Sequence, residues 1–290
     1  MGSIYALIAL GYTMVYGVLR FINFAHGDVF MLGAFAGYYL SPLVNRWLPA
    51  QSYWGGALVL VLAMAICAGI GMLIEYLAYR PLRRRPKLTV LITAIGVSLF
   101  IEYTGQNDHV FGAAPHAFPK LIPDTIWNFH GLILNSKQVI VFVTTALLLV
   151  MLRYIVQKTR IGTAMRAVSF NEQAAALMGV NINSIITFTF GLGSALAGAG
   201  GILYAMNYTS IEPFMGVQTG LKAFVAAVLG GIGNLPGAAL GGLILGLLET
   251  FAGGMAGISN YRDGIAFAIL ILILIIRPAG LLGKQQTEKV

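Results

Sequence analysis

Residues 55–79 read GGALVLVLAMAICAGIGMLIEYLAY, a run in which Glu75 is the only charged side chain. A helix of about 20 such residues is long enough to cross a hydrocarbon core of roughly 30 Å. Runs of this kind recur along the whole chain, which is 58% hydrophobic and 10% charged. A soluble domain carries about 25% charged residues, so this composition does not suit one. The pattern predicts an all-α, polytopic membrane helix bundle and one transmembrane domain over residues 1–290.

The apolar runs predict eight or nine membrane crossings. They fall at 1–20, 21–41, 55–79, 88–105, 136–157, 184–206, 219–233, 236–255 and 264–282. A glycine-rich break separates the seventh run from the eighth, and its residues are Gly230, Gly231, Gly233, Asn234, Pro236 and Gly237. We expect a broken or re-entrant hairpin there, because irregular backbone at membrane depth must face protein or a water-filled cavity.

Basic residues are concentrated in two loops between the apolar runs. Residues 80–87 carry five of them and residues 153–166 carry four. Because Lys and Arg are retained on the cytoplasmic side, both loops and the C-terminus are predicted to be cytoplasmic, and residues 106–135 external. The net charge of +8 therefore reflects topology. Nucleic-acid binding is not indicated, since few aromatic residues are interleaved with these charges on a polar surface.

Residues 158–183 form a cytoplasmic connection that is longer than a turn requires. Asn171 suits a helix N-cap, Glu172 and Gln173 suit the first turn, and Gly179 suits the C-terminal stop. These residues predict a short exposed helix.

The spacing of Gln173, Ala174, Ala175 and Gly179 resembles the EAA loop of ATP-binding-cassette (ABC) importer permeases. In that motif a Glu-Ala-Ala-x-x-x-Gly segment forms the coupling helix that docks into a groove of the ATPase. Here Gln173 occupies the first position and Glu172 precedes it. An ordinary amphipathic connector is the alternative interpretation.

Five further stretches resemble the LivH-type permeases of branched-chain amino-acid ABC importers. They are YALIALGYTMVYG (5–17), INFAHGDVFMLG (22–33), EYLAYRPLR (75–83), RIGTAMRA (160–167) and KAFVAAVLGGIGNLPGA (222–238). The resemblance covers essentially the whole chain. It implies two ATPase subunits, a second related permease, an external solute-binding protein and a place in the bacterial inner membrane.

No phosphate-binding loop of the form GxxxxGK[S/T] occurs in the sequence. We therefore expect no cofactor bound by this chain, with ATP used by partner subunits. No catalytic residues and no metal site are predicted, because no convergent nucleophile, base or ligand set is visible.

Polar residues within apolar runs need a physical reason, because charges at membrane depth are costly. Asn23, His26 and Asp28 are placed near the cytoplasmic start of the second run, where they fix a turn or line the inner mouth of a pathway. Lys222 and Glu249 flank the glycine-rich break, and an antiparallel hairpin would let them form a buried ion pair.

Other residues in the runs suit structural roles. Glu75 and Arg80, near the end of the third run, suit the membrane interface. The small residues Gly193, Ala197 and Gly201 suit close packing, against a neighbouring helix or the companion permease.

Together these observations predict a permease subunit that moves branched-chain amino acids into the cytoplasm by alternating access. Urea or short amides are alternative solutes. A further alternative is an ion-coupled secondary transporter, in which Asp28, Glu102 or Glu249 would bind the coupling ion.

Overall fold

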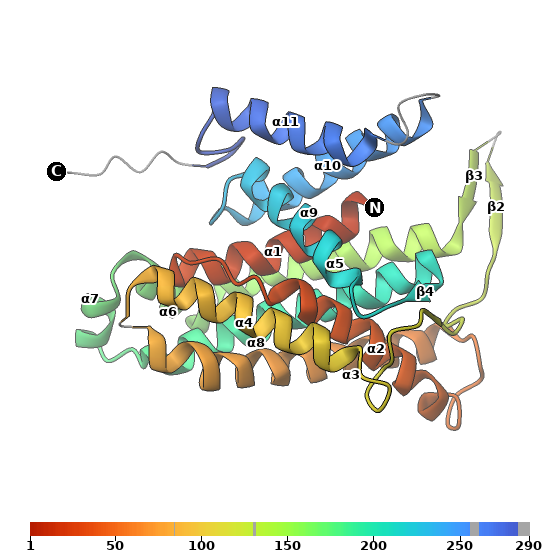
Figure 1. The fold of residues 1–290 in the computed structure, drawn as a ribbon, viewed down its shortest axis with the longest axis horizontal. Coiled ribbons are helices and arrows are strands. Elements are labelled where there is room, and N and C mark those ends of the chain that lie inside the picture. The colour runs from red at the N-terminus through yellow and green to blue at the C-terminus, as the bar shows by residue number, and fades with distance from the viewer. Residues whose placement is uncertain (84, 130–131, 256–260, 284–290) are drawn as a thin grey trace.

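The computed structural model describes residues 1–83, 85–129, 132–255 and 261–283, which are mainly helical (Figure 1). The helices are α1 (Gly2–Leu19), α2 (His26–Val44), α3 (Tyr53–Ile74), α4 (Lys87–Gly105), α5 (Ser136–Lys158), α6 (Arg160–Phe170), α7 (Glu172–Leu177), α8 (Ile182–Tyr208), α9 (Met215–Gly230), α10 (Leu235–Gly254) and α11 (Arg262–Ile276). Helix α3 continues as a π-helical turn, η1 (Glu75–Tyr79), and a 3₁₀ turn, η2 (Arg80–Leu82). The short strands form two antiparallel pairs, β1 (His116–Ala117) with β4 (Ser210–Ile211) and β2 (Ile126–Phe129) with β3 (Leu132–Asn135).

Within the described residues, six helices are long and apolar enough to cross a membrane: α1, α3 with its continuing turns, α4, α5, α8 and α10. Helix α9 is apolar but shorter, at 16 residues. Each of the nine predicted apolar runs corresponds to one helix among α1–α5 and α8–α11. The prediction of a polytopic, all-α membrane protein is confirmed.

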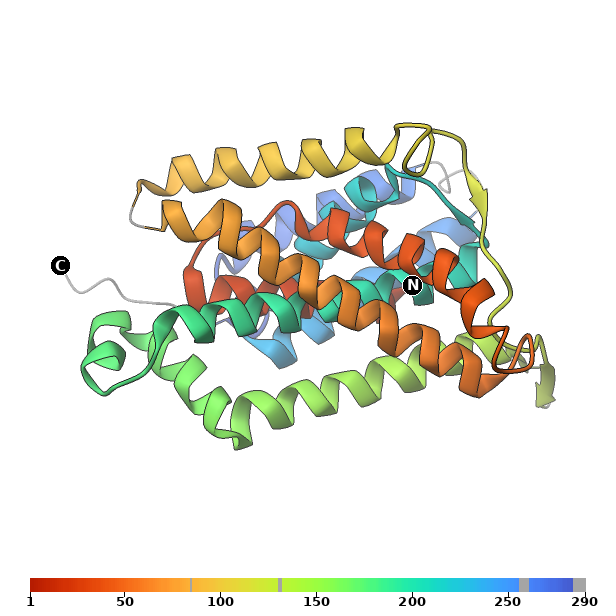
Figure 2. The ribbon, with the colours of Figure 1, turned by 90° about the horizontal axis from the view of Figure 1, so that it is seen from below.

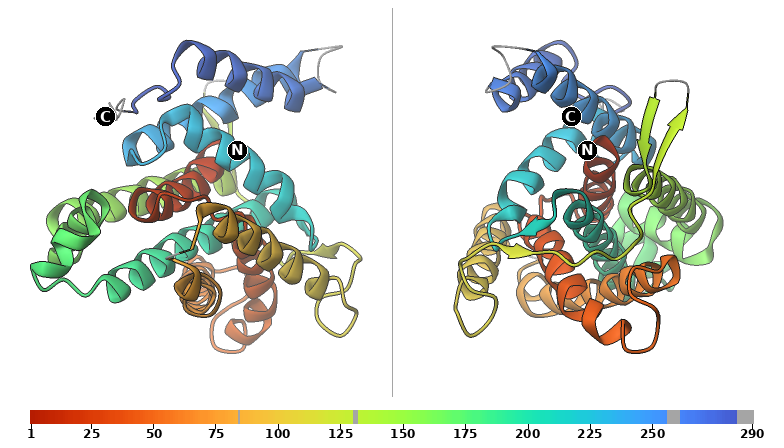
Figure 3. Two further views of the ribbon diagram at one scale, coloured as in Figure 1. Left: turned by 60° about the vertical axis from the view of Figure 1, so that its left-hand side comes forward. Right: turned by 90° about the vertical axis from the view of Figure 1, so that its right-hand side faces the viewer.

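Helices α1 and α8 form the centre of the bundle. Helix α8 packs against α1, α2 and α3, and α1 also contacts α9 and α10. Helices α4 and α5 lie on opposite flanks of this centre (Figure 2). Helix α11 lies outside α9 and α10 (Figure 3). The buried side chains of α1 extend from Ile4 to Val15, so this helix is enclosed by protein over most of its length.

Glycine residues of α8 allow its backbone to approach its neighbours closely. Gly193 lies against Gly11 of α1, and a Cβ atom at Gly201 would overlap the carbonyl oxygen of Phe30 in α2. In a bilayer such small residues let helices pack by close van der Waals contact. The predicted packing seam is confirmed, and its partners are helices of this chain.

The chain does not pass directly from α1 into α2 at the end of the bundle. Arg20 adopts a left-handed conformation, with a φ of 55°, and α1 ends there. Residues 21–25 then run back beside α1 (Figure 1). His26 begins α2 against Gly11, with its ring centroid 4.6 Å from that of Tyr12.

The prediction that the second membrane run begins at residue 21 is therefore wrong, because α2 begins at His26. Residues 21–25 form a partly buried connection and are mostly apolar, and an apolar run does not by itself distinguish such a connection from a helix. Helix α2 begins about halfway along α1 instead, as the contact between His26 and Gly11 shows.

The two ends of the bundle differ in chemistry. One end holds α6, α7 and the loop that joins η2 to α4, and we call it the basic end. At the other end the β2–β3 pair projects beyond the helices, and we call it the hairpin end (Figure 1).

Candidate functional site

The short helix predicted from capping residues is present at the basic end. Helix α7 follows Asn171, whose side-chain oxygen accepts a hydrogen bond from the amide of Ala174 at 3.0 Å. After the helix, Gly179 has a φ of 83°, and the amide of Val180 donates to the carbonyl of Ala175 at 3.1 Å. The N-cap and the glycine stop thus fix both ends of α7 as predicted.

The residues that resemble the EAA motif do not all face the same way. Ala175 is buried, whereas Glu172, Gln173, Ala174 and Gly179 are exposed. Ala175 therefore anchors α7 on the rest of the chain, and the other residues remain accessible to a partner.

Three large apolar side chains of the α7 segment, residues 170–179, are almost fully exposed. Phe170, Leu177 and Met178 are 88%, 89% and 84% exposed, outside every helix long enough to span a membrane. Large exposed apolar patches mark interaction sites. Sequence reasoning missed these residues, although three apolar side chains in a segment too short to cross a membrane were a usable signal.

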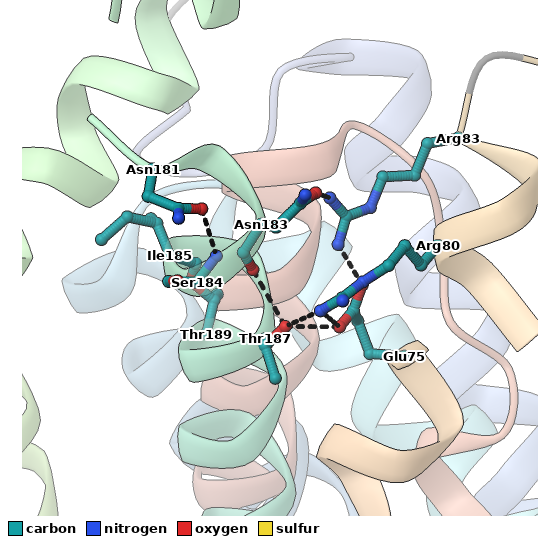
Figure 4. Close-up of polar contacts among 9 residues, drawn as sticks. All are labelled: Glu75, Arg80, Arg83, Asn181, Asn183, Ser184, Ile185, Thr187 and Thr189. Atoms are coloured by element: carbon teal, nitrogen blue, oxygen red, sulfur yellow. Dashed lines mark hydrogen bonds and ion pairs between the residues drawn. The ribbon is translucent and has the colours of Figure 1, made fainter. Parts of the chain in front are cut away.

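A buried carboxylate joins the basic end of α3 to α8 (Figure 4). The side chain of Glu75 is 0% exposed and forms ion pairs with Arg80, at 3.3 Å, and with Arg83. The hydroxyl of Thr187 in α8 donates to the same carboxylate at 2.5 Å. The prediction that Glu75 reaches the membrane interface is wrong, because these three donors make burial of its charge tolerable.

Arg83 extends this network in two directions. Its guanidinium donates to the side-chain oxygen of Asn183 at 2.8 Å, which adds a second link to α8. Burial lowers the pKa of Arg83 from its ordinary value, and the carboxylates of Glu75 and Glu172 oppose that shift. Arg83 thus lies under the electrostatic influence of both the buried carboxylate and the first residue of α7.

The predicted polar trio of the second run is buried in the bundle but does not converge on one site. Asn23 accepts a hydrogen bond from the hydroxyl of Tyr79 at 2.6 Å, and Asp28 accepts one from Ser98 of α4 at 2.5 Å. His26 packs on α1 instead. Asn23, His26 and Asp28 are each at most 3% exposed. The three side chains therefore tie the start of α2 to three different helices.

A second carboxylate lies beside Asp28. The Ser98 hydroxyl is 3.3 Å from Glu102, which is 7% exposed. Among the residues that the structure describes, no cationic side chain lies within 4.0 Å of either carboxylate, and no group of three metal-ligating side chains occurs. Asp28 and Glu102 are thus buried acidic groups without a cationic partner in the described parts of the chain.

The predicted ion pair between Lys222 and Glu249 is confirmed. The Lys222 Nζ atom lies 2.7 Å from Glu249 Oε1, with the two side chains 13% and 10% exposed. Two further partners were missed. Asp263 of α11 lies 2.7 Å from the same Nζ atom, and the Tyr5 hydroxyl of α1 donates to Glu249 at 2.6 Å. The pair is therefore the centre of a network that joins four helices.

The glycine-rich break separates α9 from α10, and its depth in the membrane stays a prediction. Gly230 is the last residue of α9. Gly231, Gly233 and Asn234 lie in the connection, and Pro236 and Gly237 lie in the first turn of α10. Gly231 and Gly233 have φ values of 104° and 92°. The amide of Leu282 donates to Gly230 at 3.0 Å, and its carbonyl accepts from Asn234 at 2.7 Å. The chain after α11 thus provides hydrogen-bond partners for part of this irregular connection.

Comparison with known proteins gives matches over the full length of the chain. The family model described as the permease component of branched-chain amino acid transport systems matches residues 1–274. The BraD permease of Pseudomonas aeruginosa is 40% identical, and the LivH permease of Escherichia coli K12 is 38% identical, each over all of this chain and 94% of the relative. A probable LivH permease of Methanocaldococcus jannaschii is 29% identical over 97% of this chain and 89% of its own length. No solved structure matches the chain.

Proposed function

The chain belongs to the family of permease components of branched-chain amino acid transport systems, and on this premise we propose that it moves these amino acids into the cytoplasm as one permease subunit of an ABC importer. The observation that carries the proposal is the match to BraD and LivH over the whole chain. Transport proceeds by alternating access, and ATP is hydrolysed by two separate ATPase subunits. A second, related permease completes the pathway, and an external solute-binding protein delivers the solute.

The proposed orientation places the basic end in the cytoplasm of a bacterial inner membrane. The positive-inside rule supports it, because Lys87, Lys158 and Arg160 lie at helix ends on that side. The segment after α11 lies beside the α9–α10 connection, and this orientation places the C-terminus that follows it in the cytoplasm. The hairpin end then faces the solute-binding protein.

The α7 segment is proposed to be the surface that docks on an ATPase. It has the spacing of the EAA motif, and it exposes Phe170, Leu177 and Met178 at the proposed cytoplasmic end. These apolar side chains suit a hydrophobic groove on a protein partner.

Uptake of labelled leucine by proteoliposomes tests the proposed function. The vesicles would contain this chain, its partner permease and the ATPases, with the binding protein outside and ATP inside. We expect uptake that requires every component. Uptake by this chain alone, driven by an ion gradient without ATP, would instead establish the secondary transporter, for which the buried Asp28 and Glu102 are the candidate ion ligands. ATP-dependent uptake of urea or acetamide without leucine would overturn the proposed substrate class.

The double change Leu177→Asp and Met178→Asp tests the docking surface. We expect it to reduce co-purification of the ATPase by at least about tenfold, because it places two charges where a partner must bury apolar surface. The fold should be unaffected, since both side chains are exposed. Trp47→Asp is the matched control, because Trp47 is 87% exposed at the hairpin end. Undiminished ATPase binding by the double variant would contradict the assignment.

A further inference from the structure

A cavity of about 400 Å³ opens at the basic end, between three segments that are distant in the sequence. Its walls come from the end of α1, from the loop between η2 and α4 with the first turn of α4, and from the end of α6 with the start of α7. Phe170 and Glu172 of the α7 segment also line the cavity, whereas Leu177 and Met178 do not.

Positive charge gathers around this cavity. Arg20, Arg83, Arg85 and Lys87 line it, against the single carboxylate of Glu172. Arg83 shares the Glu75 carboxylate with Arg80. Among the described residues, Arg20, Arg85 and Lys87 form no ion pair. Three cationic side chains from two segments therefore line the cavity, and none of them is paired with a carboxylate among the described residues.

Apart from Ser169 and Asn171, the remaining residues of the cavity wall are apolar. Val18 and Phe21 contribute from the end of α1, Val90 from α4 and Val168 from α6. Val90 belongs to a buried hydrophobic cluster that Val18 and Phe21 also pack against. A site for a small soluble anion needs no such wall, whereas a lipid presents an anionic headgroup beside hydrocarbon.

We propose that this cavity binds the headgroup of an anionic phospholipid, with the phosphate among Arg20, Arg85 and Lys87 and the adjoining acyl region against the valine side chains. The site lies where the proposed topology places the cytoplasmic leaflet, whose anionic lipids attract basic residues next to membrane helices. Lipid binding is independent of the transported solute and of the substrate class.

Native mass spectrometry of the purified full-length chain tests this site. The protein is titrated with phosphatidylglycerol and with phosphatidylcholine of the same acyl chains. We expect the first phosphatidylglycerol to bind at least about tenfold more tightly than phosphatidylcholine, since each basic residue near a headgroup adds to the attraction. Equal affinities for the two lipids overturn the proposal without any variant.

Variants then locate the binding. The triple change Arg20→Gln, Arg85→Gln and Lys87→Gln is expected to lower the affinity for phosphatidylglycerol about tenfold or more and to leave that for phosphatidylcholine unchanged. The control Arg153→Gln, Lys158→Gln and Arg160→Gln removes the same charge from the same end but outside the cavity. It should keep the parental preference. An equal loss in the two triple variants would mean that net charge alone attracts the lipid and would overturn the site.

Two displacement experiments distinguish a bound lipid from other occupants of the cavity. Displacement of bound phosphatidylglycerol by millimolar inorganic phosphate would assign the cavity to a free anion. Displacement on adding the ATPase subunits would assign it to that protein. Either result overturns the proposal, and retention of the lipid in both experiments supports it.

Discussion

Replacing Lys222 with methionine is expected to destabilise the folded protein by about 3–5 kcal/mol, because it strands buried carboxylate charge. Lys222 Nζ lies 2.7 Å from both Glu249 and Asp263, and the Glu249 side chain is only 10% exposed. The tyrosine hydroxyl that donates to Glu249 is retained in the variant, but it carries no positive charge. The loss should appear as a lower thermal unfolding temperature and as less folded protein recovered from membranes.

A double-mutant cycle separates this pairing from ordinary loss of packing. Glu249→Gln alone is expected to cost less, because Lys222 keeps Asp263 as a partner. The double variant Lys222→Met with Glu249→Gln should lose less than the sum of the single changes. Strictly additive losses would contradict a contribution from the pair. Lys120→Met is the matched control, since Lys120 is 61% exposed in its pair with Asp124 and its loss should have little effect on stability.

The sequence was sufficient for features that depend on local chemistry. The hydrophobic runs located the long helices, because a span of the bilayer needs an unbroken apolar segment. Asn171 and Gly179 located α7, because an N-cap side chain and a residue with positive φ satisfy groups at helix ends. The pairing of Lys222 with Glu249 followed from the expectation that charges at membrane depth need partners.

Features that depend on long-range contacts were not predictable in the same way. Tyr5 and Glu249 are 244 residues apart, and no spacing rule connects them. The start of α2 at His26 was missed because residues 21–25 are as apolar as a helix would be. Their path is decided by tertiary contacts, such as the hydrogen bond between Asn23 and Tyr79. The burial of Glu75 likewise depends on Thr187, which lies on another helix.

Replacing Glu75 with glutamine is expected to cost about 3–5 kcal/mol in folding stability, because the two neighbouring guanidinium groups lose their shared counter-charge. Arg80 and Arg83 both pair with this carboxylate, and the Arg83 side chain is only 13% exposed. The double variant Glu75→Gln with Arg83→Gln should recover part of the loss, since it removes the more buried of the two stranded cations. Thermal unfolding of the purified variants gives the measurement.

The same network should affect transport as well as stability. Glu75 and Arg83 tie the end of α3 to Thr187 and Asn183 of α8, the helix that follows the α7 segment in the chain. A displacement of α7 by a docked ATPase would therefore be carried to α8 and, through this network, to α3. In folded, reconstituted Glu75→Gln complexes we expect leucine uptake per ATP hydrolysed to fall, with ATPase binding retained. Arg153→Gln is the control, because its exposed guanidinium donates to Gln157 within α5, outside the α7 segment and this network, and its loss should leave that ratio unchanged. If the Glu75 variant kept the parental ratio, the network would serve stability alone, and coupling would have to pass through other contacts of α6 and α8.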